Sequence, residues 1–231
     1  MAKERIAACS LLALGAIFAA AACHLQPPAL APVPALLDEI EGYASFKVTR
    51  SGETAKSKLS FVLEPSRRAK VEVLDLLSRT VAEIYVDGQD GYLILPLEKA
   101  YWKATPEEII GKFLGSRLSL PEMTGLLCGR WRGERSGEEL VFSEWAFEED
   151  AGKRKVSGRK EDFEFKVLEF FRGSSVPRRL DFRSTDCRGT ISLLAMAFNR
   201  PVAENLFALD FLERFSSKSW EDIEKILRHE N

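Results

Sequence analysis

The sequence predicts a mainly β protein with a few helices, in which one long antiparallel sheet curls to bury a face. Apolar and polar residues alternate along about 11 short segments that turn residues separate, a pattern typical of half-buried strands. Two helical segments with strong start signals interrupt this series halfway, near residues 105–128. A sheet of this length must curl to bury one face, and helices inserted at its midpoint are placed to cover the mouth.

The N-terminus begins with a short charged segment and an apolar run, residues 6–22, that ends at Cys23. This arrangement is typical of a secretory signal, and its last residues resemble a bacterial lipobox, in which the cysteine is lipidated and becomes the new N-terminus. We therefore expect a signal peptide over 1–22 and a lipidation site at Cys23. A plain cleaved signal is one alternative, and a retained, marginal transmembrane helix is another.

Residues 23–35 are rich in proline, which favours extended backbone, so we expect a flexible tether behind the lipid. Its second residue is His24, not the Asp that retains enterobacterial lipoproteins in the inner membrane. The expected location is the outer membrane, with the protein lipid-anchored and facing the periplasm. Pro34 suits the first turn of a short helix that Gly42 would end.

About six strands are expected before the first interior helix, because apolar side chains recur at every second position. The alternation starts at Ala44, Phe46 and Val48, and the turn at 51–52 leads into the next strand. Further strands are expected around 59–63, 71–73, 82–86, 92–95 and 100–103.

Two helices should follow. Thr105 is a suitable N-cap, Pro106 occupies the first helical position, Glu108 completes a capping box, and Gly115 ends the helix. The second helix starts after Ser119 and runs to about residue 128. Strands resume at 140–147, 156–157, 163–171, 179–183 and 190–198, and a C-terminal extension over 201–231 carries a helix near 219–229.

Composition argues against several classes of function. The 33 basic and 35 acidic residues give a net charge of −2, which does not suit a nucleic-acid partner. The only histidines, His24 and His229, lie in the tether and the C-terminal tail, so we expect no enzyme, no metal site and no cofactor. We expect a monomer. Cys128 and Cys187 have two open fates, a disulfide or, more commonly for isolated cysteines, buried free thiols.

Two segments carry a resemblance to a known family. Residues 107–115 have an acidic start and an Ile-Gly-Lys core, and the second helix ends in Leu-Leu-Cys-Gly at 126–129. Residues 71–80 form a strand that leads into a loop with Leu77 at its tip, flanked by Leu76 and Ser78, which depart from the family's pattern. Together with the element order, these segments resemble the LolB family of outer-membrane lipoproteins. The resemblance covers roughly residues 42–200, within a LolB-like half-barrel expected over 36–200.

The resemblance implies an unclosed, strongly curved antiparallel β-barrel with a helical lid over an apolar cavity for acyl chains. It implies a receptor that accepts acylated client lipoproteins from a LolA-like periplasmic carrier and delivers them to the membrane. Leu76 and Leu77 correspond to the loop that acts in membrane transfer.

A cavity that fully enclosed the acyl chains of its cargo would bind them too tightly to release them. One sixteen-carbon chain offers on the order of 12 kcal/mol, and three chains exceed the practical ceiling of about 18 to 21 kcal/mol. We therefore expect partial enclosure in a plastic cavity. The expected lining residues are Phe46, Phe61, Leu63, Val73, Ile84, Leu95, Trp102, Ile110, Phe113, Met123 and Leu127.

Two alternatives stay open. The same residues taken singly suit an ordinary packed core, and the protein would then be a structural or assembly lipoprotein that binds a protein partner or another lipid-like ligand. If Cys23 were not lipidated, a soluble LolA-like carrier would be the better interpretation.

Overall fold

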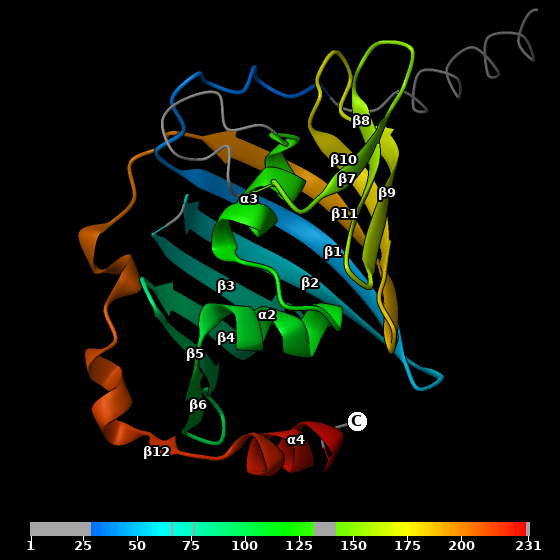
Figure 1. Cartoon of the computed structure of the whole chain (residues 1–231). Coiled ribbons are helices and arrows are strands. Elements are labelled where there is room, and N and C mark those ends of the chain that lie inside the picture. The colour runs from blue at the N-terminus through cyan, green and yellow to red at the C-terminus, as the bar shows by residue number, and fades with distance from the viewer. Residues whose placement is uncertain (1–28, 66, 76, 132–141, 230–231) are drawn as a thin grey trace, which may run out of the picture.

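The computed structural model describes residues 29–65, 67–75, 77–131 and 142–229 (Figure 1). It contains one curved, open sheet of 12 strands, in the order β12-β6-β5-β4-β3-β2-β1-β11-β10-β9-β8-β7. Neighbouring strands are antiparallel, except that β12 runs parallel to β6. The strands are β1 (Ile40–Arg50), β2 (Glu53–Glu64), β3 (Arg68–Leu74), β4 (Thr80–Asp87), β5 (Asp90–Leu95), β6 (Ala100–Ala104), β7 (Ala146–Glu149), β8 (Lys155–Lys160), β9 (Phe163–Phe170), β10 (Pro177–Arg183), β11 (Cys187–Phe198) and β12 (Ser216–Ser217). The mainly β class and the unclosed half-barrel are confirmed.

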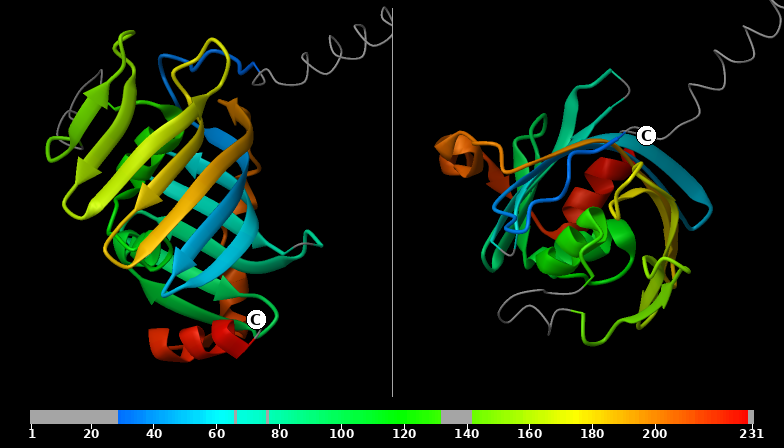
Figure 2. Two further views of the ribbon diagram at one scale, coloured as in Figure 1. Left: turned by 90° about the vertical axis from the view of Figure 1, so that its right-hand side faces the viewer. Right: turned by 90° about the horizontal axis from the view of Figure 1, so that it is seen from above.

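Two helices, α2 (Pro106–Leu114) and α3 (Leu120–Cys128), lie inside the curve of the sheet, as the view from above shows (Figure 2, right). Their boundaries follow from the capping signals. Thr105 and Ser119 each accept a hydrogen bond from the backbone three residues on, with Glu108 and Glu122 completing the two capping boxes. Gly115 ends α2 with φ 72°, a conformation that glycine adopts without steric cost.

The C-terminal extension crosses from one face of the sheet to the other. On the convex face, Phe207 is buried under the Arg68 guanidinium, and Phe211 contacts Tyr85, with ring centroids 6.1 Å apart. The chain then pairs with the β6 edge as β12 and ends in α4 (Trp220–His229), which packs against the apolar ends of β4–β6 (Figure 1). The helix expected near 219–229 is confirmed, and it covers part of the concave face.

The short helix expected from Pro34 to Gly42 is wrong. Residues 35–39 are not helical, and β1 already begins at Ile40. Gly42 lies within β1 opposite Phe61, where a Cβ would come within 2.1 Å of the Phe61 ring. The glycine therefore makes room for an aromatic ring across the sheet and does not end a helix, a tertiary role that local pattern does not reveal.

The strand expected over 140–147 starts late. Residues 142–144 form a turn, and β7 begins only at Ala146. Residues 140 and 141, the signal peptide, Cys23 and Leu76 lie outside the described residues. Within the described ranges, no helix is both long and apolar enough to cross a bilayer.

Candidate functional site

The strand residues expected to line a cavity all lie on the concave face. Residues directly opposite each other in neighbouring strands share a face, and positions two apart along one strand do the same. The register pairs Gly42 with Phe61, Phe61 with Val71, Val71 with Ile84, Ile84 with Leu93, and Leu93 with Trp102. By the same alternation this face also carries Phe46, Leu63, Val73 and Leu95. The seven strand residues expected to line a cavity thus share one face of the sheet, and their role in binding acyl chains stays a prediction.

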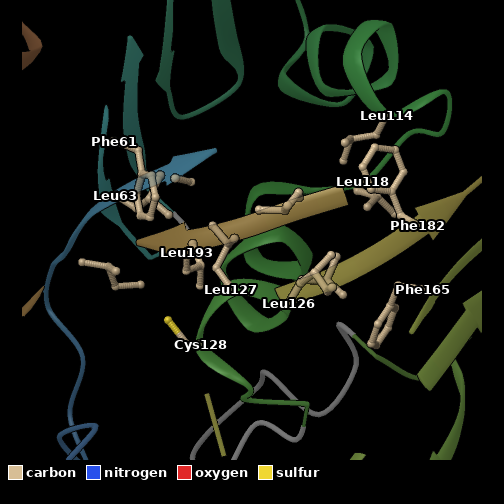
Figure 3. Packing of buried hydrophobic residues seen from close by; sticks show 14 of the residues in the cluster. Phe61, Leu63, Leu114, Leu118, Leu126, Leu127, Cys128, Phe165, Phe182 and Leu193 are labelled. Atoms are coloured by element: carbon tan, nitrogen blue, oxygen red, sulfur yellow. The ribbon is translucent and has the colours of Figure 1, made fainter. Parts of the chain in front are cut away.

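Two buried clusters fill the concave side. The larger one joins α3 and part of α2 to β1–β4 and β9–β11, and Figure 3 shows Leu126, Leu127 and Cys128 of α3 facing Leu63, Leu193 and Phe165. An aromatic group that includes Trp131, Trp145, Phe147 and Phe165, with Trp131 and Phe165 stacked 5.0 Å apart, closes the end of this cluster. Phe46, Phe61, Leu63 and Leu127 are buried here.

The smaller cluster lies under the C-terminal helix. Ile223 of α4 is fully buried with Leu93 and Leu95, and Trp220 contacts Trp102 with ring centroids 5.0 Å apart. The Lys112 ammonium of α2 lies 4.4 Å from the centre of the Trp220 ring. Sequence reasoning identified the amphipathic helix but not this place for it, because the contact joins segments more than 100 residues apart.

A set of half-buried apolar side chains lies along the seam between the two clusters. On the sheet, Leu59 stands opposite Val73, and Val71 stands opposite Ile84. On the lid, Ile110 packs against the larger cluster, whereas Phe113, one turn further along α2, packs against the smaller one. We call this set the apolar strip; its members are Leu59, Val71, Val73, Ile84, Ile110, Phe113 and Met123, all of them partly exposed. Five of the expected lining residues belong to it: Val73, Ile84, Ile110, Phe113 and Met123.

A buried carboxylate fastens α3 to the sheet. Glu122 is only 2 % exposed and accepts hydrogen bonds from Trp145 Nε1 at 2.7 Å and from Lys160 Nζ on β8 at 2.8 Å. It also accepts from Ser119 at the helix start. Burial alone would raise the pKa of Glu122, but these donors outweigh burial and hold the pKa below its ordinary value of 4.5. The carboxylate is therefore charged at neutral pH, and α3 is held by an ion pair within the apolar interior.

Both cysteines of the described chain are buried free thiols, so the second of the two fates holds. Cys128 packs beside Leu127 at the end of α3 (Figure 3), and burial raises its pKa to about 12. Cys187 at the start of β11 lies next to the backbone of Phe113, and burial raises its pKa as well. Neither thiol is poised for chemistry at neutral pH.

The loop between β3 and β4 presents an apolar tip. Leu77 is 74 % exposed, and Asp75 holds the turn beneath it by accepting hydrogen bonds from the backbone of Leu77 at 2.8 Å and of Arg79 at 2.9 Å. Ser78 has φ 61°, the left-handed conformation that non-glycine residues rarely adopt. The loop projects away from the sheet (Figure 2). Its role in transfer stays a prediction.

Two clefts lie away from the apolar strip. One, of about 310 Å³, lies beside α2 and involves Trp102, Lys112 and Arg117. The other, of about 380 Å³, opens on the convex face across β1 and β9–β11 and has a mostly polar rim. The first cleft is formed by residues within 102–117 and includes Trp102, one of the expected lining residues. Sequence reasoning did not predict the second cleft, because it combines residues from distant strands.

The architecture is a LolA-like half-barrel, an open and curved antiparallel sheet with helices on its concave side. A LolA superfamily protein from Nitrosomonas europaea is similar with a TM-score of 0.52 and 10 % sequence identity, over 78 % of this chain and 93 % of that one. A DUF1329 family protein from Desulfovibrio piger is similar with a TM-score of 0.52 and 9 % identity, over 77 % and 92 %. No family model and no curated protein matches the sequence. At these identities the likeness concerns the fold alone.

Proposed function

We propose that this protein is a lipid-anchored receptor that accepts acylated lipoproteins from a LolA-like periplasmic carrier and delivers them to the outer membrane. The observation that carries the proposal is the apolar strip on the concave face of a LolA-like fold. Apolar side chains there remain partly in contact with water although helices lie over them. An acyl chain would complete their burial at about 25 cal/mol per Å² removed from water.

An apolar strip that is only partly covered by helices suits a transfer protein. Because the strip is half-buried in the unliganded protein, only the remainder of its surface contributes to cargo binding, and affinity stays well under the ceiling of about 18 to 21 kcal/mol. α2 lies across the seam. Few polar contacts hold it there: Arg50 of β1 donates a part-buried hydrogen bond to the Lys112 carbonyl at 2.9 Å, and the ion pair of Arg117 with Glu108 at 3.5 Å is exposed and therefore weak. We infer that α2 moves aside for cargo while α3 stays fixed by Glu122.

The anchor would keep the half-barrel close to the membrane. The described chain starts at Ala29, which bridges Arg172 in the turn between β9 and β10. If Cys23 carries lipid, the six or so intervening residues reach at most about 20 Å. The half-barrel would then sit directly above the bilayer that receives the cargo.

A second candidate is a structural or assembly lipoprotein with a filled core and a protein partner. The observation that favours it is α4, whose buried Ile223 occupies the concave side beneath β4–β6. In that case the apolar strip is a packing seam, and acyl chains have no site.

Replacing Val73 with Asp separates the two candidates. A carboxylate in the strip would face the acyl chain without a partner, so we expect at least a tenfold loss of affinity for a fluorescent diacylated lipopeptide. The matched control is Val62→Asp, because Val62 is also half-buried but lies on the convex face of the adjacent strand. Equal binding by both variants, or no binding by the unsubstituted protein, would favour the filled core.

A further inference from the structure

The convex face carries an unusual concentration of positive charge. The strand register places three rows of residues across β8–β11, β1 and β2 on this face. One of these rows consists of Lys166, Asp181, Thr190, Lys47 and Lys56, side by side on successive strands. Figure 2 (left) looks onto this surface. We call its exposed cations the basic face; they are Lys47, Lys56, Lys58, Arg159, Lys166, Arg179 and Arg188.

These cations have no acidic partner within the described part of the chain. The carboxylates in the same rows are already engaged, since Glu164 pairs with Arg183 at 2.6 Å and Asp181 accepts from Thr190 at 2.7 Å. Glu169 pairs with Arg178 on the neighbouring strand. The chain as a whole has a net charge of −2, so the basic face is a local asymmetry and does not follow from composition.

A cleft opens within the basic face. It holds about 380 Å³, with Lys47, Lys166 and Arg188 on its rim and the Phe165–Phe182 row beneath. Its size falls at the lower end of the roughly 300–1,000 Å³ of small-molecule sites. Two carboxylates also line the cleft, Glu164, which pairs with Arg183, and Asp181. The three cations without an acidic partner outnumber the one carboxylate that no cation neutralises, so the cleft fits a phosphate-bearing headgroup.

The basic face adjoins the two features that point to the membrane. Lys58 stands directly opposite Leu74, three positions before the exposed Leu77. At its other side, β10 follows the turn where Arg172 bridges Ala29, the first described residue after the expected tether. A single surface thus carries cations and borders both the apolar loop tip and the point of attachment.

We propose that the basic face rests on the anionic headgroups of the membrane to which the protein is anchored, with one headgroup in the cleft and Leu77 entering the interface. This inference rests on the proposed anchoring and adds the orientation of the half-barrel. Each cation near an anionic surface strengthens association about fivefold, and screening by salt weakens it over about 10 Å. The concave face and its lid then point away from the headgroups, open to an incoming carrier.

The test uses the mature lipidated protein in vesicles. A fluorophore is attached at Ser192→Cys, in the middle of the basic face, and the vesicles carry a headgroup quencher. The native thiols are buried, so labelling is selective. We expect strong quenching in vesicles with about one-third phosphatidylglycerol, weak quenching in phosphatidylcholine alone, and loss of the difference in high salt.

Three substitutions sharpen the test. We combine Lys47→Gln, Lys58→Gln and Lys166→Gln in one variant. In this variant, the ratio of molecules whose basic face lies on the membrane to molecules in other orientations should fall by on the order of 100-fold. The matched control removes the same charge far from this face, as Lys99→Gln, Arg214→Gln and Lys218→Gln, and should keep full quenching.

Equal quenching in neutral and anionic vesicles, or an unaffected triple variant, would overturn the proposal. Absence of quenching in both kinds of vesicle would also overturn the proposal. The basic face would then be a binding surface for an acidic protein and not for lipid headgroups. The vesicles contain neither cargo nor carrier, so this experiment does not involve acyl binding. A negative result would refute only the proposed orientation on the membrane, and the Val73→Asp variant tests acyl binding separately.

Discussion

Asp75 shapes the loop between β3 and β4 through hydrogen bonds to the backbone of Leu77 and Arg79 and to the Arg79 side chain at 2.7 Å. These bonds hold the pKa of Asp75 below its ordinary value, with the backbone of Arg79 contributing most. The leucine is therefore presented by a fixed turn. Sequence alone indicated the tip but not its support, which includes Ser78 in the left-handed conformation.

Replacing Leu77 with Glu should separate acceptance from delivery. The side chain is exposed and does not belong to the apolar strip, so stability should change by less than about 0.5 kcal/mol and cargo binding should persist. A charge is costly to insert into a membrane interface, so release of bound lipoprotein into vesicles should fall at least tenfold.

The control is Leu97→Glu, another exposed leucine at 72 %, in the turn between β5 and β6. Delivery measured by vesicle flotation should be unchanged in this control. Normal delivery by Leu77→Glu would remove the loop from the mechanism.

At the scale of elements, local signals set the helices and the strands. The residues Thr105, Gly115 and Ser119 predict where α2 and α3 begin or end, because capping is decided within a few residues. The helix expected before Gly42 failed because the reason for that glycine is Phe61, on another strand. Tertiary partners of this kind cannot be inferred from spacing along the chain.

The attachment of α3 gives a prediction at this scale. Glu122→Gln removes the charge that Lys160 and Trp145 contact in the interior, so we expect the free energy of unfolding to fall by about 2 kcal/mol in urea titrations. The control is Glu108→Gln, the same capping position in α2 but more exposed, which should cost less than about 0.5 kcal/mol.

The difference in the free energy of unfolding between the wild type and Glu122→Gln should become smaller as the pH falls. Because the pKa of Glu122 is lower in the folded protein than its ordinary 4.5, its stabilisation is present above that pH and is lost as pH falls through the folded pKa. Wild type and Glu122→Gln should therefore converge in acid. A constant difference down to pH 3 would show that the ion pair is not its source.

At the scale of the whole molecule, the two faces of the sheet carry different kinds of side chain. The concave face carries the apolar strip under α2, and the convex face carries free cations beside Leu77. Alternation of residue types predicted the division between the faces. It did not predict how α4 would cover the concave side, because nothing near Trp220 in the sequence specifies Trp102 as its partner.

The most direct measurement of the central claim is photo-crosslinking of an acyl chain to the apolar strip. A photoreactive amino acid replaces Ile110, on the lid side of the strip, or Val62, on the convex face, and the protein receives a lipoprotein with radiolabelled acyl chains. We expect label to be captured at position 110 and not at position 62. Absence of capture at position 110, or equal capture at both, would contradict an acyl-binding role for the concave face.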